Sequence, residues 1–108
     1  MLDITDSIID IIYEGEIEKL RNIVNEAGDV NLFRDKYGNT LLHHAIEATI
    51  NNDDYKLIKY LINEEKADVN ALNMAGICIY DIIEKEVGIY SELMQILVLS
   101  NRLKLKYD

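Results

Sequence analysis

The chain has 108 residues, of which 49 % are hydrophobic and 29 % are charged, and its formal net charge is −9. This length predicts a single domain, and so many aliphatic positions argue against a disordered chain. The negative balance argues against binding to nucleic acid or to an anionic membrane surface, because both are polyanions; it favours a basic protein partner or simple solubility.

The cysteine content and the first residues bear on the cellular compartment. Cys78 is the only cysteine, so no disulfide can form within the chain, which fits a reducing compartment. No apolar run approaches the ~18 residues that a membrane span needs. Residues 1–6 carry acids where a secretory signal needs positive charge. We therefore expect a cytoplasmic protein.

Residues 1–31 contain two segments with helical spacing. Asp6 or Ser7 is placed to cap the first helix, because a short side-chain oxygen can accept the free amides of a first turn. Gly15 interrupts the pattern, and Gly28 is placed to end the second helix with a positive φ. The apolar positions of the two stripes are Ile8, Ile9, Ile11, Ile12, Ile17, Leu20, Ile23 and Val24.

The same 31 residues hold eight acids and two bases, which is a net charge of −6 out of the total of −9. Such a face is commonly just the solvated outside of a helix pair. The other interpretation is an acidic patch that steers a basic partner toward the protein. The sequence leaves both open.

Residues 35–70 carry the clearest motif. It opens with the run DKYGNTLLHHA at 35–45, continues through two segments with helical spacing and closes with the run ADVN at 67–70. The segment resembles the ankyrin repeat, whose signature is a turn, then T-P-L-H-x-A, two antiparallel helices and a G-A-D-V-N loop. Leu41 stands where that family prefers Pro, and Lys66 where it prefers Gly.

The resemblance implies an all-α fold, an ankyrin-repeat solenoid of about three helix-turn-helix repeats with protruding hairpin loops. A single domain, 1–108, would contain repeats at about 4–34, 35–72 and 73–100 and a C-terminal tail at 101–108. Gly38 and Gly76 recur 38 residues apart, which exceeds the usual ~33 of the family. We assign the excess to the connection between the two helices, from Thr49 to Asp53.

The middle repeat allows the most detailed predictions. Thr40 should cap its inner helix, and the outer helix should run from Asp54 to Asn63. The positions expected to be buried are Leu41, Leu42, Ala45, Ile46, Leu57, Ile58, Leu61 and Ile62. By resemblance, His43 makes hydrogen bonds that tie neighbouring loops, while His44 is partly exposed. Two adjacent histidines on a helix point about 100° apart, so they do not predict a metal site.

The last third of the chain has drifted furthest from the motif. Only Gly76 matches the repeat frame outright. Cys78 takes the position of the Thr, where we expect a small, half-buried packing residue, and Asp81 replaces the His. Val87 and Gly88 mark the break before a final helix.

That final helix is apolar around almost its whole circumference, at Leu93, Met94, Ile96, Leu97, Val98 and Leu99. A terminal repeat should present a polar face to water, so something must cover this one. Three covers are open: the chain's own tail through Leu103, Leu105 and Tyr107, a second copy of the protein, or the partner.

The sequence offers no catalytic motif. It has no G-x-S-x-G, no phosphate-binding glycine loop and no Cys/His ligand spacing, and no acid is coupled to a nucleophile. We therefore predict a protein that is not an enzyme, without catalytic residues, cofactor or metal.

The family binds partners through its hairpin tips and the concave face of its inner helices. Carried over by position, the residues at the tips and at the starts of the inner helices are Phe33, Arg34, Lys36, Tyr37, Asn39, Met74, Ala75 and Ile77. Those expected along the concave helices are Glu47, Glu84 and Lys85. Phe33 has an alternative, which is to tuck its ring beneath the repeat instead of offering it to a partner.

The function implied is binding to another protein. The favoured form is a small acidic inhibitor that blocks its target, as bacterial immunity proteins neutralise toxins that are often basic. The alternatives are an adaptor or decoy for signalling proteins, similar to the ankyrin proteins of viruses and intracellular bacteria, and a homodimeric scaffold held by the final helix.

Overall fold

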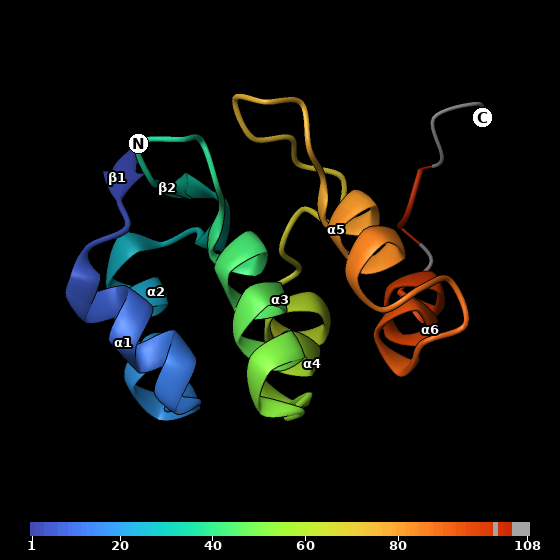
Figure 1. Cartoon of the computed structure of the whole chain (residues 1–108). Helices are drawn as coiled ribbons and strands as arrows, with labels where there is room; N and C mark the ends of the chain where they lie inside the picture. Colours follow the sequence, from blue (N-terminus) through green and yellow to red (C-terminus); the bar gives the residue numbers. More distant parts are fainter. Residues whose placement is uncertain (101, 105–108) are drawn as a thin grey trace.

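The computed structural model describes residues 1–100 and 102–104, and it is mostly helical (Figure 1). Its described residues form six α-helices. Their bounds are α1 (Asp6–Glu14), α2 (Ile17–Ala27), α3 (Leu41–Asn52), α4 (Lys56–Lys59), α5 (Ile79–Glu86) and α6 (Glu92–Leu99). A π-helical segment, η2 (Tyr60–Glu64), continues α4, and a short 3-10 helix, η1 (Val30–Leu32), follows α2.

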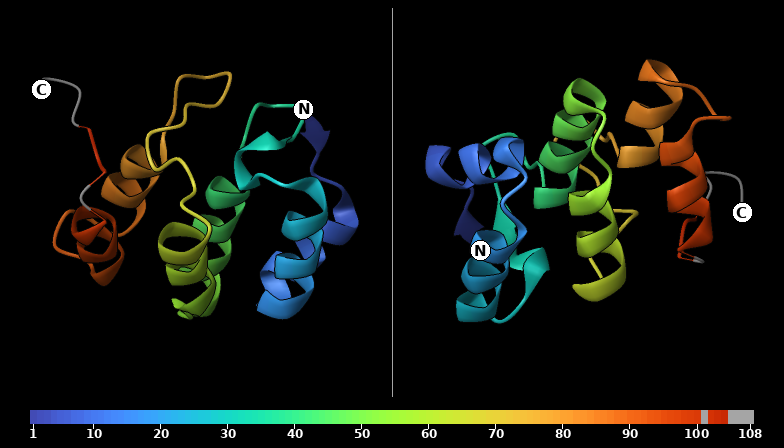
Figure 2. Two further views of the ribbon diagram at one scale, coloured as in Figure 1. Left: turned by 180° about the vertical axis from the view of Figure 1, so that it is seen from behind. Right: turned by 90° about the horizontal axis from the view of Figure 1, so that it is seen from below.

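The helices form two layers. In the first layer α3 packs between α1 and α5. The second layer consists of α2, α4 with η2, and α6, each packed against or joined to its partner in the first layer (Figure 2). The loops that precede α3 and α5 both project from the same end of the helices (Figure 1).

The described residues also include a short pair of strands, which the sequence did not lead us to expect. β1 (Leu2–Asp3) and β2 (Phe33–Arg34) run parallel, with Leu2 opposite Phe33 and Asp3 opposite Arg34. The amide of Ile4 extends the pairing by donating to the carbonyl oxygen of Arg34 at 3.1 Å. The all-α prediction was therefore incomplete, since strands of two residues leave no alternating pattern to detect.

The ends of the first two helices follow the glycines. Gly15 (φ 69°) ends α1 and Gly28 (φ 90°) ends α2, both with the positive φ expected of such caps. The predicted N-cap was wrong by one residue. Thr5, rather than Asp6 or Ser7, has an extended backbone, and its Oγ1 accepts the amide of Ile8 at 3.3 Å.

The prediction that residues 49–53 form an extra-long connection is wrong. Residues 49–52 instead extend α3 by about one turn, and the helix ends where Asp53 adopts a left-handed φ of 56°. At the end of this extra turn, the side-chain amide of Asn52 donates to the carbonyl oxygen of Tyr13 at 3.1 Å. The added turn therefore contacts α1 instead of forming a loop.

In the second layer, the guanidinium of Arg21 links α2 to η2. This guanidinium donates to Glu64 Oε2 at 2.7 Å and lies 5.0 Å from the ring centroid of Tyr60.

The outer helix that follows α3 starts later than predicted, at Lys56 rather than Asp54. Lys66, in the position where glycine is preferred, is forced to a φ of 57°.

The core is one continuous apolar cluster that spans all six helices. All eight positions predicted to be buried in the central helix pair are buried, namely Leu41, Leu42, Ala45, Ile46, Leu57, Ile58, Leu61 and Ile62. Thr40 caps α3 as predicted, since its Oγ1 accepts the amide of His43 at 3.2 Å. No helix among the described residues is both long and apolar enough to cross a bilayer.

The final helix is only partly covered. Leu93, Met94 and Leu97 are buried, but Val98 is 54 % exposed and Leu99 is 78 % exposed. Of the tail residues suggested as a cover, Leu103 packs against the core. Leu105 and Tyr107 lie outside the described residues.

Replacing Leu42 or Leu61 by alanine should destabilise the protein by about 2–5 kcal/mol, because both side chains are fully buried and a cavity would remain. Chemical denaturation followed by circular dichroism measures the effect. Leu72→Ala, at an exposed position of the second loop, is the control and should change the free energy of unfolding by less than about 1 kcal/mol. A Leu42→Ala protein as stable as this control would contradict the packing.

Candidate functional site

The loop before α3 is built around the carboxylate of Asp35. Its Oδ1 accepts the amides of Tyr37 at 2.8 Å and Asn39 at 2.9 Å, and its Oδ2 lies 2.8 Å from Nε2 of His44. Partial burial acts to raise the pKa of Asp35, but the hydrogen bonds from Asn39, His44 and Tyr37 outweigh it, so the pKa lies below its usual range. The loop is thus held in one shape by an ionised side chain.

The loop before α5 repeats this construction 38 positions later. Oδ1 of Asn73 accepts the amides of Ala75 at 2.9 Å and Ile77 at 3.0 Å. Gly76 has a φ of 75°, close to the 78° of Gly38. A neutral amide oxygen therefore does in the second loop what a carboxylate does in the first.

The two loops are bonded to each other. The amide of Met74 donates to the carbonyl oxygen of Tyr37 at 2.9 Å, and the side-chain amide of Asn73 donates to Oδ1 of Asn39 at 2.9 Å. One contact joins the two turn tips and the other joins the bases of the turns. The tips therefore form one fixed surface rather than two independent loops.

Arg34 strengthens this connection from below. Its Nη1 donates to the carbonyl oxygens of Gly38 at 2.7 Å and Leu72 at 2.9 Å. The side chain is half-buried, and its hydrogen bonds are made within the protein. We predicted that Arg34 would contact a partner, but it holds the binding surface in position instead. The half-buried Asn39 has the same role.

Several exposed side chains lie on the joined tips of the two loops. Tyr37 is 61 % exposed and Met74 is 78 % exposed, while Leu72 and Ile77 are also exposed. The ammonium group of Lys36 lies 5.1 Å from the ring centroid of Tyr37. We call Lys36, Tyr37, Leu72, Met74 and Ile77 the tip ridge. Leu72 was missed from the sequence, although its place two positions before Met74 in the same loop was a signal that could have revealed it.

Phe33 does not belong to the tip ridge. It is 3 % exposed and packs in the core, so the prediction of a partner contact was wrong and the alternative, a ring tucked beneath the repeat, is correct. The pairing of β2 with β1 fixes this position, and that pairing was not visible in the local sequence.

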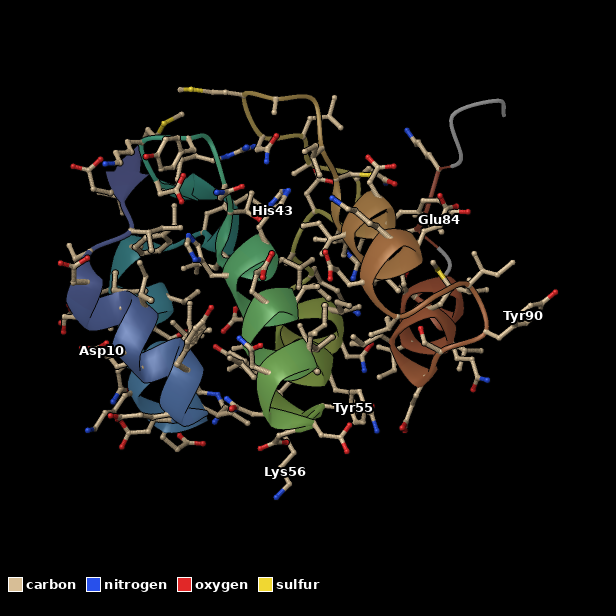
Figure 3. All side chains as sticks on the ribbon, in the orientation of Figure 1. Asp10, His43, Tyr55, Lys56, Glu84 and Tyr90 are labelled. Carbon is tan, nitrogen blue, oxygen red and sulfur yellow. The ribbon has the colours of Figure 1, made fainter. Side chains whose placement is uncertain are left out.

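The remaining predicted residues are exposed but lie outside the tip ridge. Ala75 is exposed in the second loop, Glu47 is exposed on α3, and Glu84 and Lys85 are exposed on α5, where Figure 3 labels Glu84. The carboxylate of Glu84 accepts a hydrogen bond from Tyr80 and so raises the pKa of that phenol.

A groove of about 670 Å³ runs beside the ridge. It is bounded by Lys36 and Tyr37 of the ridge and by Asp3, Asp6 and Ile9 from the start of the chain. The acidic N-terminal residues therefore reach the edge of the tip ridge, where they face the groove together with the ammonium group of Lys36.

His43 supports the loops from inside, as the resemblance implied (Figure 3). Its Nδ1 accepts the amide of Thr40 at 3.1 Å, so the proton must sit on Nε2, which donates to the carbonyl oxygen of Ile77 at 2.9 Å. Burial is the main cause that lowers the pKa of His43. The neutral side chain links the start of α3 to the next loop.

Within residues 1–100 and 102–104, no group of three or more His, Cys, Asp or Glu side chains is placed to hold a metal ion. Cys78 is half-buried as predicted, and its Sγ lies 3.4 Å from Oδ2 of Asp81, which also accepts the Cys78 amide. This pair caps α5.

Comparison with known families gives a match to part of the chain. Residues 37–74 match the family model described as the ankyrin repeat. The matched segment begins at Tyr37 and ends at Met74, the two residues that join the loop tips. No curated protein and no solved structure matches the chain.

Gly38→Ala should destabilise the protein more than Gly76→Ala. Both glycines need a positive φ, which costs an alanine about 1–2 kcal/mol. At Gly38 the new Cβ would also lie 2.9 Å from the backbone nitrogen of Met74, whereas at Gly76 nothing lies within 4 Å. Thermal or chemical unfolding of the two variants measures the difference. Equal losses would show that the loops do not approach as described.

Stability should fall with acid because of His43. Its folded-state pKa is lowered, so the unfolded chain binds a proton more readily; the stabilisation is complete above about pH 6.5 and is lost as the pH falls toward the folded-state pKa. Urea denaturation between pH 7.5 and pH 5 measures a slope of at most about 1.4 kcal/mol per pH unit. His43→Gln, which can still donate but does not titrate, should flatten this slope. An unchanged slope in that variant would refute the assignment.

Proposed function

We propose that the chain belongs to the ankyrin-repeat family, whose model residues 37–74 match, and that it binds another protein through the tip ridge. The repeats of this family are generally modules for protein–protein interaction and are generally non-catalytic. The observation that carries this proposal is the exposure of Tyr37 and Met74 on loops that a backbone hydrogen bond joins. Tyrosine and methionine are enriched at interfaces, and loops whose backbone is already fixed by hydrogen bonds lose little backbone entropy on binding.

We also propose that the helix pairs on either side of the matched segment are diverged repeats of the same kind. The loop construction of Asp35 recurs at Asn73 with the same pattern of bonds. A second recurrence links Asn31, whose side chain accepts the amide of Asp68, and Asn70, whose side chain accepts the amide of Lys104. Such recurrences support three stacked repeats in one domain.

The proposed partner is a basic protein in the cytoplasm. The chain would inhibit this partner, as an immunity-type protein inhibits a toxin. Residues 1–31 contribute −6 of the net charge of −9. The carboxylates of Asp3 and Asp6 border the groove beside the ridge. Opposite charge would speed association and orient a basic partner, while the apolar ridge would supply most of the affinity.

Capture from an extract of the source cell tests this proposal. The immobilised chain should retain a protein that the double variant Tyr37→Ala/Met74→Ala binds at least about 30-fold more weakly, since losing one anchor residue costs about 2 kcal/mol. Both side chains are exposed, so the variant should remain folded. Mass spectrometry then identifies the captured protein.

Tyr13→Ala is the matched control, because it removes another exposed tyrosine, near the end of α1 and outside the ridge. It should capture the partner as the original chain does. A captured basic nuclease or other toxin would support inhibition, and a signalling protein would support an adaptor instead. Capture that survives the double variant would refute the tip ridge as the binding surface.

A further inference from the structure

A second exposed apolar surface lies at the far end of the helix layers, on α6 and the loop before it. Its members are Ile89, Val98 and Leu99, which are exposed, together with the buried Met94 and the exposed Gln95; they line a shallow hollow. We call these five residues the end patch. Tyr90, next to it, points away from the body of the protein (Figure 3). No ionisable side chain belongs to the end patch.

The described part of the tail is engaged elsewhere. The guanidinium of Arg102 donates to the carbonyl oxygens of Ile62 and, at 2.8 Å, Ala67. The side chain of Asn70 donates to the carbonyl oxygen of Arg102 at 2.7 Å and accepts the amide of Lys104 at 2.7 Å. These bonds hold residues 102–104 against the loop that follows η2, and the end patch remains exposed beside them.

Charge distinguishes between a second copy of the chain and a basic partner as the occupant of the end patch. A basic partner is attracted to net negative charge, and residues 1–31, which form the helix pair at the opposite end of the layers, contribute −6 of the net charge of −9 (Figure 1). The end patch offers such a partner no charge to pair with. An uncharged apolar surface is best matched by another of the same kind, and two copies meeting here keep their acidic ends apart.

We infer that the end patch is a self-association surface, through which two copies of the chain meet about a twofold axis that passes close to Leu99. A twofold contact uses the same patch on both copies, so one apolar patch is sufficient. Each copy would bury Val98 and Leu99 against α6 of the other. The tip ridges stay free, so the dimer would present two binding surfaces and gain avidity for a clustered partner.

Analytical ultracentrifugation of the 108-residue chain tests this inference. The weight-average mass should rise from 12.5 kDa toward twice that value as the concentration increases from about 10 µM to about 1 mM. Leu99→Lys and Leu99→Glu should each weaken self-association by at least ~10-fold, because a twofold contact places like charges opposite each other. An equimolar mixture of the two variants should associate again.

Leu32→Lys and Leu32→Glu are the matched controls, because Leu32 is also an exposed leucine and lies in η1, outside both the end patch and the tip ridge. These variants should associate as the original chain does, alone and mixed. A chain that stays monomeric up to about 1 mM would overturn the inference, and so would a dimer that the Leu99 variants leave intact or that does not re-form in their mixture. None of these outcomes affects capture through the tip ridge.

Discussion

The packing of α3 between α1 and α5 is the constraint on which the rest of the structure depends. A single helix pair cannot bury its own apolar stripe, so each pair needs a neighbour at a fixed distance. Side chains such as Leu42 fill the space between helices, but polar contacts set the spacing of the loops above them. His43 reaches from the start of α3 to Ile77 in the next loop. Apolar burial and loop geometry therefore enforce the same spacing.

The polar network of the loops explains how apolar side chains can be kept exposed at their tips. Asp35 and Asn73 bond the backbone amides of their own turns, and Arg34 bonds carbonyl oxygens of both loops. With these backbone groups paired, the loops do not need their side chains to fold inward. Tyr37 and Met74 can remain in water on a rigid support, which reduces the entropy lost when a partner binds them.

Much of the fold could be predicted because the apolar spacing is local. Leu57 and Leu61 are buried as expected even though η2 departs from α-helical geometry after four residues. The errors came from non-local effects. Phe33 is buried because β2 pairs with β1, some thirty positions earlier in the chain. The family's usual spacing predicts a connection at residues 49–53, yet residues 49–52 extend α3, whose added turn contacts α1. Of the candidate site, the tip positions followed from the motif, but whether a tip side chain such as Arg34 faces a partner or its own backbone depends on bonds between loops.

The two exposed apolar surfaces differ in their electrostatic surroundings, and this difference separates their partners. The tip ridge carries Lys36 and borders a groove with Asp3 and Asp6, so a partner that docks there must match charges as well as apolar area. The end patch around Leu99 contains no ionisable residue, so it selects by shape and hydrophobicity alone. Charges speed encounter and reject poorly matched partners, whereas apolar area adds affinity without direction. A surface of the second kind serves best where the two partners meet at high concentration and with a fixed geometry, as two copies of one chain do.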